Sequence, residues 1–347
     1  MARVHLLAWD NQRGLSHDIA VVEGALRERG HEVTVSRLGS RRYDGAWRLR
    51  GMRVRMRLAS WLTLGRKPAR FDINLSLEHV RPAAFGLARI DLLMPNPEWV
   101  SGRSLRYLTR YDALLTKTHE ATRLFEARGL RAIEVGFRSP DRYDPSVARQ
   151  PRTFLHAAGS SQLKGTATLV AVWKRHPEWP LLTVLRAGAP GEDDGGAANL
   201  RIVRERLSDA EVRHLQNASP FHLCLSQTEG WGHYLVEAMS CGAVVMTCDG
   251  APMNQMIDDT RGILVAAREG EPHNLARTWH VDETALERAV ERAIAMDEGE
   301  RATLGHHARS WYLANQMAFP ARIGASLDAL LADGRRVVAG DTGRHPR

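Results

Sequence analysis

Two carboxylates in this sequence are spaced so that they could share one ligand. Glu229 and Glu237 lie eight positions apart, on either side of a turn in which Gly230 and Gly232 flank Trp231. A carboxylate accepts hydrogen bonds from hydroxyl groups, so paired hydroxyls of a sugar or a ribose suit one acid at each end of the turn. The spacing alone also permits an ordinary helix start, with Glu229 near the first turn and Glu237 in solvent.

The elements that would position these acids form a predicted strand–helix–strand unit. Apolar runs at 221–225 and 243–247 predict two strands, and the residues between them predict a helix over 232–240. Glycines let a ligand approach the backbone closely, and a helix N-terminus presents free N–H groups and a positive dipole end. Phosphate is the ligand best matched to such a place.

The strand–loop–helix plan occurs twice more in the chain. Near the N-terminus, a strand at 4–9 leads through a turn containing Gly14 into a helix at 19–29 and a strand at 32–36. A strand at 153–157 then opens a second such run, after a stretch rich in Pro, Asp and Ser at 136–151. This order predicts an α/β protein with two Rossmann-like domains joined by a linker.

The central stretch resembles the E-x7-E signature of retaining GT-B glycosyltransferases of the large "group one" family. The matching residues are Ser226-Gln-Thr-Glu229-Gly-Trp-Gly232 and Glu237-Ala-Met-Ser-Cys-Gly242. The resemblance implies two Rossmann-like domains facing across a cleft. We expect an acceptor domain at 1–148, with a C-terminal helix at about 318–340 packing back on it, and a donor domain at 149–317.

The resemblance also implies roles for single residues. Glu229 would position the transferred sugar, Glu237 would bind the nucleotide ribose, and Lys164 would neutralise the donor diphosphate. Ser160 or Ser161 stands where the family has an arginine, so hydroxyl contacts replace one cation. The other donor-binding residues implied are Gly14, Gly159, Gly230, Trp231 and Gly232.

Three further residues are candidates for the sugar or acceptor side. Asn96 and Glu98 follow a predicted strand at 90–94, in a region where many family members have a histidine that approaches the donor sugar. His119 begins a predicted helix after a strand at 113–118. A histidine at a helix start also suits a plain surface or capping role.

The predicted reaction is a retaining, metal-independent transfer from a UDP- or GDP-type sugar nucleotide to an acceptor hydroxyl, on a membrane-associated glycan or lipid. The chain has no DxD pair on a loop after a strand, and no cofactor is expected. Two alternatives stay open. One is a degenerate nucleotide-sugar binding protein, since Gln255 stands where the family has an acid, and the other is a transferase that acts on modified DNA.

Composition and charge predict the cellular location of the protein and the kind of surface that it contacts. Among 347 residues, 44% are hydrophobic and no apolar run approaches a membrane span, so we expect a cytoplasmic protein whose three cysteines are core thiols. The net charge is +8, and residues 37–70 contain eleven Arg or Lys and a single acid, Asp44. Such a segment favours an anionic membrane surface, with a solvated basic helix or a nucleic acid as alternatives.

Overall fold

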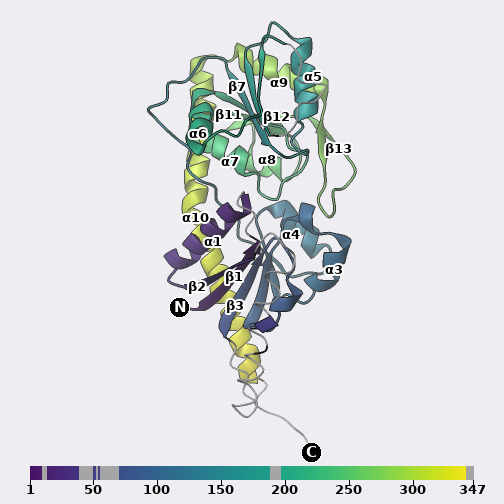
Figure 1. Cartoon of the computed structure of the whole chain (residues 1–347), viewed down its shortest axis with the longest axis vertical. Coiled ribbons are helices and arrows are strands. Elements are labelled where there is room, and N and C mark those ends of the chain that lie inside the picture. The colour runs from purple at the N-terminus through teal and green to yellow at the C-terminus, as the bar shows by residue number, and fades with distance from the viewer. Residues whose placement is uncertain (10–13, 39–49, 52–53, 55–69, 188–196, 341–347) are drawn as a thin grey trace, which may run out of the picture. The chain divides into compact units, whose positions relative to one another are not determined.

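The computed structural model describes residues 1–9, 14–38, 50–51, 54, 70–187 and 197–340 (Figure 1). Its contacts divide the chain into two units, of which the first comprises Met1–Phe137 with Met317–Arg347 and the second comprises Arg138–Gln316. The predicted division came later, at 148/149. Residues 138–148 belong to the second unit because Arg142 forms an ion pair with Asp209 there, at 2.7 Å.

The first unit contains, among the described residues, a six-stranded parallel sheet in the order β2-β1-β3-β4-β5-β6. Strand order reverses between β1 and β3, as in flavodoxin-like folds. Residues of β1, β3 and β5 are buried almost without interruption, which is typical of a parallel sheet covered on both faces. Its elements are β1 (Arg3–Trp9), α1 (Gly14–Glu28), β2 (Glu32–Leu38), β3 (Phe71–Leu77), β4 (Ala88–Met94), α3 (Gly102–Leu108), β5 (Ala113–Thr116), α4 (His119–Glu126) and β6 (Ala132–Glu134).

The second unit contains another six-stranded parallel sheet in its described part, in the order β12-β11-β10-β7-β8-β9. Read from the β9 edge, this is the 3-2-1-4-5-6 order of a Rossmann fold. The sheet elements and helices are β7 (Phe154–Gly159), α5 (Thr166–Arg175), β8 (Leu182–Arg186), β9 (Leu200–Val203), α6 (Asp209–Ala218), β10 (Phe221–Cys224), α7 (His233–Ser240), β11 (Val244–Cys248), α8 (Met253–Met256), β12 (Gly262–Val265) and α9 (Glu283–Ala295).

Helices cover both faces of this second sheet. α7 packs on β10 and β11, while α5 and α9 contact each other on the opposite face (Figure 1). Phe154 lies at the centre of the core, stacked on Phe221 at 4.8 Å and edge-on to Trp173 at 5.1 Å. A short hairpin, β13 (Ala267–Glu269) with β14 (Trp279–Val281), follows the last strand.

The long helix α10 (Glu298–Gly340) contributes to both units. From Met317 onward it belongs to the first unit, where Phe319 packs against Phe137 at 5.3 Å and Arg322 donates to the Val135 carbonyl at 3.0 Å. Its earlier part belongs to the second unit, where Tyr312 donates a hydrogen bond to the Ser139 carbonyl at 3.0 Å.

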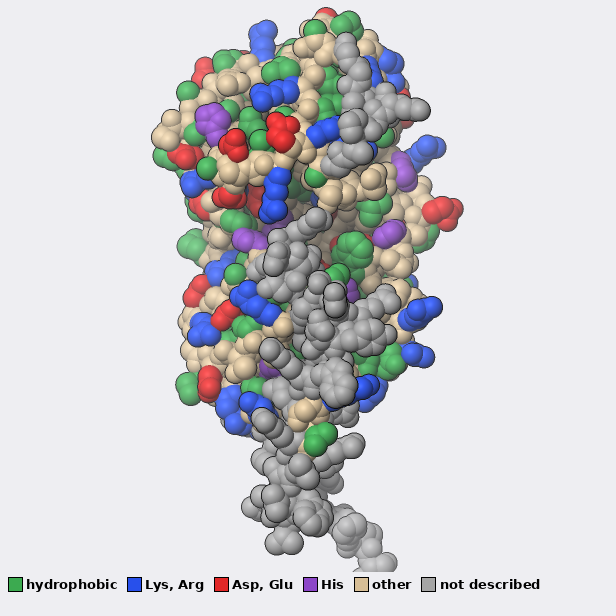
Figure 2. Space-filling model, in the orientation of Figure 1, with side chains coloured by type: hydrophobic (Ala, Val, Ile, Leu, Met, Phe, Trp, Pro, Cys, Tyr) green, Lys and Arg blue, Asp and Glu red, His purple; other side chains and the backbone are tan. Residues whose placement is uncertain are grey.

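Three sequence predictions concern burial and surface. All three cysteines are buried free thiols, as predicted, and burial raises the pKa of Cys241 and Cys248 to about 12. The Arg-rich segment 37–70 falls mostly on residues 39–49, 52–53 and 55–69, which lie outside the described residues. On the face shown in Figure 2, Lys and Arg side chains lie among Asp and Glu side chains over both units. Within the described chain, no helix combines the length and apolar character of a membrane span.

The contact between α10 and the end of α7 yields a stability prediction. A Cβ at Gly305 would lie 2.2 Å from the Gly242 carbonyl oxygen, so Gly305→Ala would force backbone apart. We expect a loss of about 1–3 kcal/mol in the free energy of unfolding, as for other overpacked sites. Denaturant unfolding followed by circular dichroism measures it. Gly299→Ala, in the exposed first turn of the same helix, should leave stability unchanged or slightly raised; equal losses in both variants would contradict the packing account.

Candidate functional site

The candidate site lies where the strand order of the second sheet reverses. β7 and β10 are neighbours in the sheet although β8 and β9 separate them along the chain. The chain leaves β7 toward one edge of the sheet and leaves β10 toward the other. In α/β sheets, ligands bind beyond the carboxyl ends of the strands at such a point. The loops that leave these two strands carry Lys164 and Glu229.

A buried histidine of β7 links this strand to β10 and to the start of α5. His156 of β7 donates from Nδ1 to the Leu223 carbonyl of β10 at 2.7 Å, and its Nε2 accepts from the Thr166 hydroxyl of α5 at 2.9 Å. This tautomer follows because a carbonyl oxygen can only accept. Burial lowers the pKa of His156 to about 4, so the imidazole is neutral at pH 7.

The loop after β7 packs closely on the loop after β10. Gly165 has φ 68°, and a Cβ there would lie 2.5 Å from the Leu225 carbonyl oxygen. The Gln227 N–H also donates to the Leu163 carbonyl at 2.8 Å. Only glycine satisfies both the left-handed backbone and this close approach.

Lys164 and Glu229 are in direct contact. The ammonium of Lys164 donates to Oε1 of Glu229, and both side chains are largely buried, with 16% and 13% exposed. The ammonium also lies 3.8 Å from the centroid of the Tyr234 ring, a cation–π contact. The two residues predicted to act on different parts of the donor therefore neutralise each other in this structure.

A hydroxyl chain ends on the same carboxylate oxygen. Ser226 donates its one hydroxyl proton to Oε1 of Glu229 at 2.5 Å, so Tyr234 is the donor to Ser226, at 2.6 Å. Burial, with the neighbouring Cys224 and Glu229, holds the pKa of the Tyr234 phenol well above its usual value. Tyr234 thus stays a protonated donor, and Oε1 of Glu229 is fixed by two groups.

The helix α7 carries the second predicted acid. Gly232 precedes it with φ 78° and supplies no side chain to cap its first turn. Glu237 lies one turn further along, and Oε2 of its carboxylate accepts from Nε2 of Gln216 in α6 at 3.0 Å. The predicted strand–helix–strand unit at 221–247 is confirmed by β10, α7 and β11.

Trp231 and the residue after Gly232 are anchored from outside the motif. The indole N–H of Trp231 donates to Oγ of Ser139 at 3.1 Å, and the same hydroxyl pairs with Nδ1 of His233 at 2.8 Å. Trp231 is buried, so its side chain holds the turn in place. Among the remaining predicted residues, Gly159 ends β7, and Ser160 and Ser161 are exposed in the loop that follows.

The residues predicted for the acceptor side all lie in the first unit. Asn96 is buried and donates to Oε1 of Glu78 at 2.9 Å. Glu98 is buried too, whereas His119 is exposed and contacts Glu134 at 3.3 Å. Gly14 is the first residue of α1.

A buried lysine joins the acidic residues of the first unit. Lys117, which directly follows β5, forms an ion pair with Asp18 of α1 at 2.7 Å. Burial opposes its charge, but Asp18, Glu78 and Glu98 outweigh burial and raise the pKa of Lys117. The structure therefore brings Asn96 and Glu98 into one buried charged group and leaves His119 outside it.

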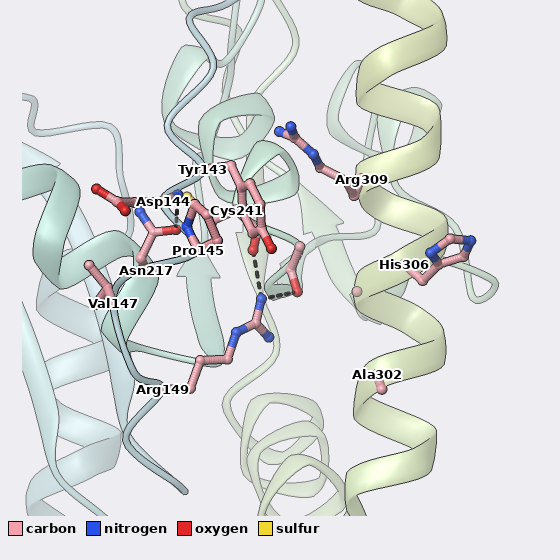
Figure 3. A pocket seen from close by; sticks show the side chains of 12 residues that line it. Tyr143, Asp144, Pro145, Val147, Arg149, Asn217, Cys241, Ala302, His306 and Arg309 are labelled. Atoms are coloured by element: carbon pink, nitrogen blue, oxygen red, sulfur yellow. Dashed lines mark hydrogen bonds between the residues drawn. The ribbon is translucent and has the colours of Figure 1, made fainter.

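A separate hollow of about 450 Å³ lies at the other end of α7. One of its two arginines, Arg149, points at the C-terminus of α7 and donates to the carbonyls of Cys241 and Gly242 at 2.6 and 2.9 Å (Figure 3). Arg309, on α10, also lines it and is paired with Asp141 at 2.8 Å. The hollow is distinct from the candidate site, which lies at the N-terminal end of the helix.

Sequence reasoning missed three side chains that hold the two candidate acids. Ser226 and Tyr234 stand inside the motif, three before and five after Glu229, so their spacing was a usable signal. Gln216 lies 21 residues before Glu237 in another helix, and no local pattern points to it.

One family model matches the chain. Residues 198–308 match the family described as "Glycosyl transferases group 1", which confirms the predicted resemblance for this part of the chain. The GDP-mannose:cellobiosyl-diphosphopolyprenol alpha-mannosyltransferase of Xanthomonas oryzae pv. oryzae is 32% identical over an alignment of 149 residues, and the match covers 39% of this chain and 39% of that protein. The chain thus matches about two fifths of the length of this relative.

Solved structures resemble the whole chain. HepE from Anabaena, in complex with UDP-glucose, aligns with a TM-score of 0.65 and 13% identity over 96% of this chain and 100% of that one. Sucrose-phosphate synthase from Thermosynechococcus elongatus has a TM-score of 0.65 and 15% identity over the same shares. At these identities the likeness shows the fold, and the predicted GT-B fold with two Rossmann-like domains is confirmed.

The neutral buried His156 predicts a pH dependence of stability. The unfolded chain binds a proton on this imidazole near pH 6.5, whereas the folded chain does so only near pH 4, so acid favours unfolding in that window. Between pH 7 and pH 4, the wild type should lose about 3 kcal/mol more unfolding free energy than His156→Gln, from denaturant titrations at each pH. His306→Gln, at an exposed site of the same unit, should behave as wild type. The same loss in His156→Gln as in wild type would contradict the assignment.

Proposed function

Because residues 198–308 match the group 1 glycosyl transferases, we propose that this protein transfers a sugar from a nucleoside-diphosphate sugar to an acceptor hydroxyl. The transfer retains the anomeric configuration and uses no metal ion. The donor site is the one at the β7/β10 switch point of the second unit.

The observation that carries this proposal is the contact between Lys164 and Glu229 beside the start of α7. An ammonium group and a helix N-terminus together stabilise the negative charge of a leaving diphosphate. A carboxylate at the same place accepts hydrogen bonds from sugar hydroxyls. Glu237, further along the helix, is the residue proposed to accept hydrogen bonds from the ribose.

When the sugar nucleotide binds, Lys164 and Glu229 release each other and bind groups of the ligand instead. Without a donor, the charge of Lys164 is balanced by Glu229. A sugar nucleotide offers a phosphate to the lysine and hydroxyls to the carboxylate, so neither charge is left buried without a partner. This exchange matters because removing one partner of a buried ion pair, while the other stays charged and buried, costs about 3–5 kcal/mol.

The chemistry requires no nucleophile from the protein. The bond from the anomeric carbon to the diphosphate oxygen breaks, and the acceptor oxygen bonds to that carbon on the same face. The departing phosphate oxygen takes the proton of the acceptor hydroxyl. Glu229 positions the sugar, and Ser226 still donates to its Oε1 once Lys164 has turned to the diphosphate.

The acceptor we propose is a glycan or lipid at the cytoplasmic membrane surface. The Xanthomonas relative is named for a diphosphopolyprenol acceptor and a GDP-mannose donor, and HepE was solved with UDP-glucose. These names support a GDP- or UDP-type donor and a lipid-linked acceptor. Asn96 and Glu98 of the first unit are the residues proposed for the acceptor side.

A thermal-shift panel of nucleoside diphosphates and sugar nucleotides tests the donor site. One diphosphate should raise the melting temperature of the wild type, and Glu237→Ala should abolish that shift because the ribose loses its acceptor. Glu229→Gln should keep the shift with the diphosphate but lose the additional shift given by the sugar. Glu291→Ala, at an exposed position of α9, is the matched control and should behave as wild type. No shift with any nucleotide would overturn the donor site.

Product analysis with the donor so identified tests the reaction. We expect the same rate in excess EDTA as without it, and NMR spectra of the early product should show the anomeric configuration of the donor. A rate lost in EDTA and restored by Mg²⁺ or Mn²⁺ would refute metal independence, and the opposite anomer would refute retention. Binding without transfer or hydrolysis would make the protein a nucleotide-sugar binding protein.

A further inference from the structure

A buried glutamine holds the second acid of the donor site. Gln216 of α6 is 2% exposed, and its Nε2 donates to Oε2 of Glu237 at 3.0 Å. Its carbonyl oxygen accepts from Nε of Arg142 at 2.8 Å. The amide therefore links the segment that enters the second unit to the helix that carries Glu237.

The orientation of this amide is fixed by its neighbours. A guanidinium group can only donate and a carboxylate can only accept, so the oxygen of Gln216 must face Arg142 and its NH₂ must face Glu237. Arg142 is itself held, because it donates to the Asp209 carboxylate at 2.7 Å and to the Asp209 carbonyl at 3.0 Å. Its backbone N–H donates to the Ser240 hydroxyl, at 2.9 Å, at the end of α7.

These hydrogen bonds engage one carboxylate oxygen of Glu237 and leave the other available to a ligand. Oε2 accepts from Gln216, and in the described part of the chain no donor is recorded for Oε1. Glu237 is half-buried, so Oε1 can reach a ligand while the side chain is held in a single orientation. A carboxylate that is fixed in this way loses less freedom when it binds a diol.

We propose that Gln216 is a positioning residue that presents Oε1 of Glu237 to the paired hydroxyls of the donor's ribose. The proposal rests on the proposed function, since it assumes that a nucleoside diphosphate binds at this site. It adds that ribose recognition depends on a residue outside the family signature, through the chain Asp209–Arg142–Gln216–Glu237.

The test compares affinities for a ribonucleotide and its dideoxy form. Calorimetry gives the Kd of the wild type for UDP and GDP and for their 2′,3′-dideoxy analogues. The preferred ribonucleotide should bind about tenfold or more tightly than its analogue, as expected for hydrogen bonds to a charged group. In Gln216→Glu, the new carboxylate still accepts from Arg142 but cannot donate to Glu237. We expect its preference to fall to about twofold.

Two further variants separate positioning from folding. Gln216→Met removes the donor without adding charge and should lose the same preference. Gln150→Glu repeats the first substitution at an exposed position outside the chain of hydrogen bonds and should keep the wild-type preference. In a Glu237→Ala background, Gln216→Glu should change the ratio of the two affinities no further, because Gln216 acts only through Glu237.

The outcomes distinguish this inference from the proposed function. A wild type that binds no nucleoside diphosphate overturns both. A wild type that prefers the ribonucleotide, with Gln216→Glu and Gln216→Met keeping that preference, overturns the role of Gln216 and leaves the donor site standing. A further change of the ratio in the Glu237→Ala background would show that Gln216 acts by another route and overturns the proposal.

Discussion

The adjacency of β7 and β10 is the constraint on which the candidate site depends. It brings together two residues that lie 65 positions apart in the chain, Lys164 and Glu229, and the neutral imidazole of His156 links β7 to β10 and to α5. Gly165 then allows the first loop to lie against the Leu225 carbonyl. The contact between the lysine and the acid follows from this arrangement. The core beneath it, above all the stacking of Phe154, keeps the two strands in register.

Each charged side chain described around α7 has a partner that compensates or hydrogen-bonds it. At its N-terminal end, Lys164 and Glu229 compensate each other, and at its C-terminal end Arg149 donates to carbonyl oxygens that the helix cannot satisfy itself. Between them, Glu237 is linked through Gln216 to a guanidinium group. The helix is thus held along its length by groups from three other segments, and a ligand at its first turn meets a prearranged site.

Local patterns explain how much of this could be predicted. Apolar runs and glycines located β10, α7 and β11. The eight-residue spacing alone left an ordinary helix start open, and the resemblance to the E-x7-E signature selected Glu229 and Glu237 as the candidate acids. Strand order could not be predicted, because a sequence does not state which strands pair. For the same reason the contact of Glu237 with Gln216 was missed. The stretch 138–148 has the composition of a linker, yet its Arg142 forms an ion pair within the second unit.

The pairing of Lys164 with Glu229 also limits how this sequence can evolve. Losing either charge alone leaves the other largely buried without an opposite charge, and such a change is strongly destabilising. Acceptable substitutions at the two positions must therefore occur together, although the positions lie far apart in the chain. Exposed neighbours such as Ser160 and Ser161 are under no such restriction. Among descendants of this chain, positions 164 and 229 should change as a pair, whereas the loop between Gly159 and Lys164 can drift one residue at a time.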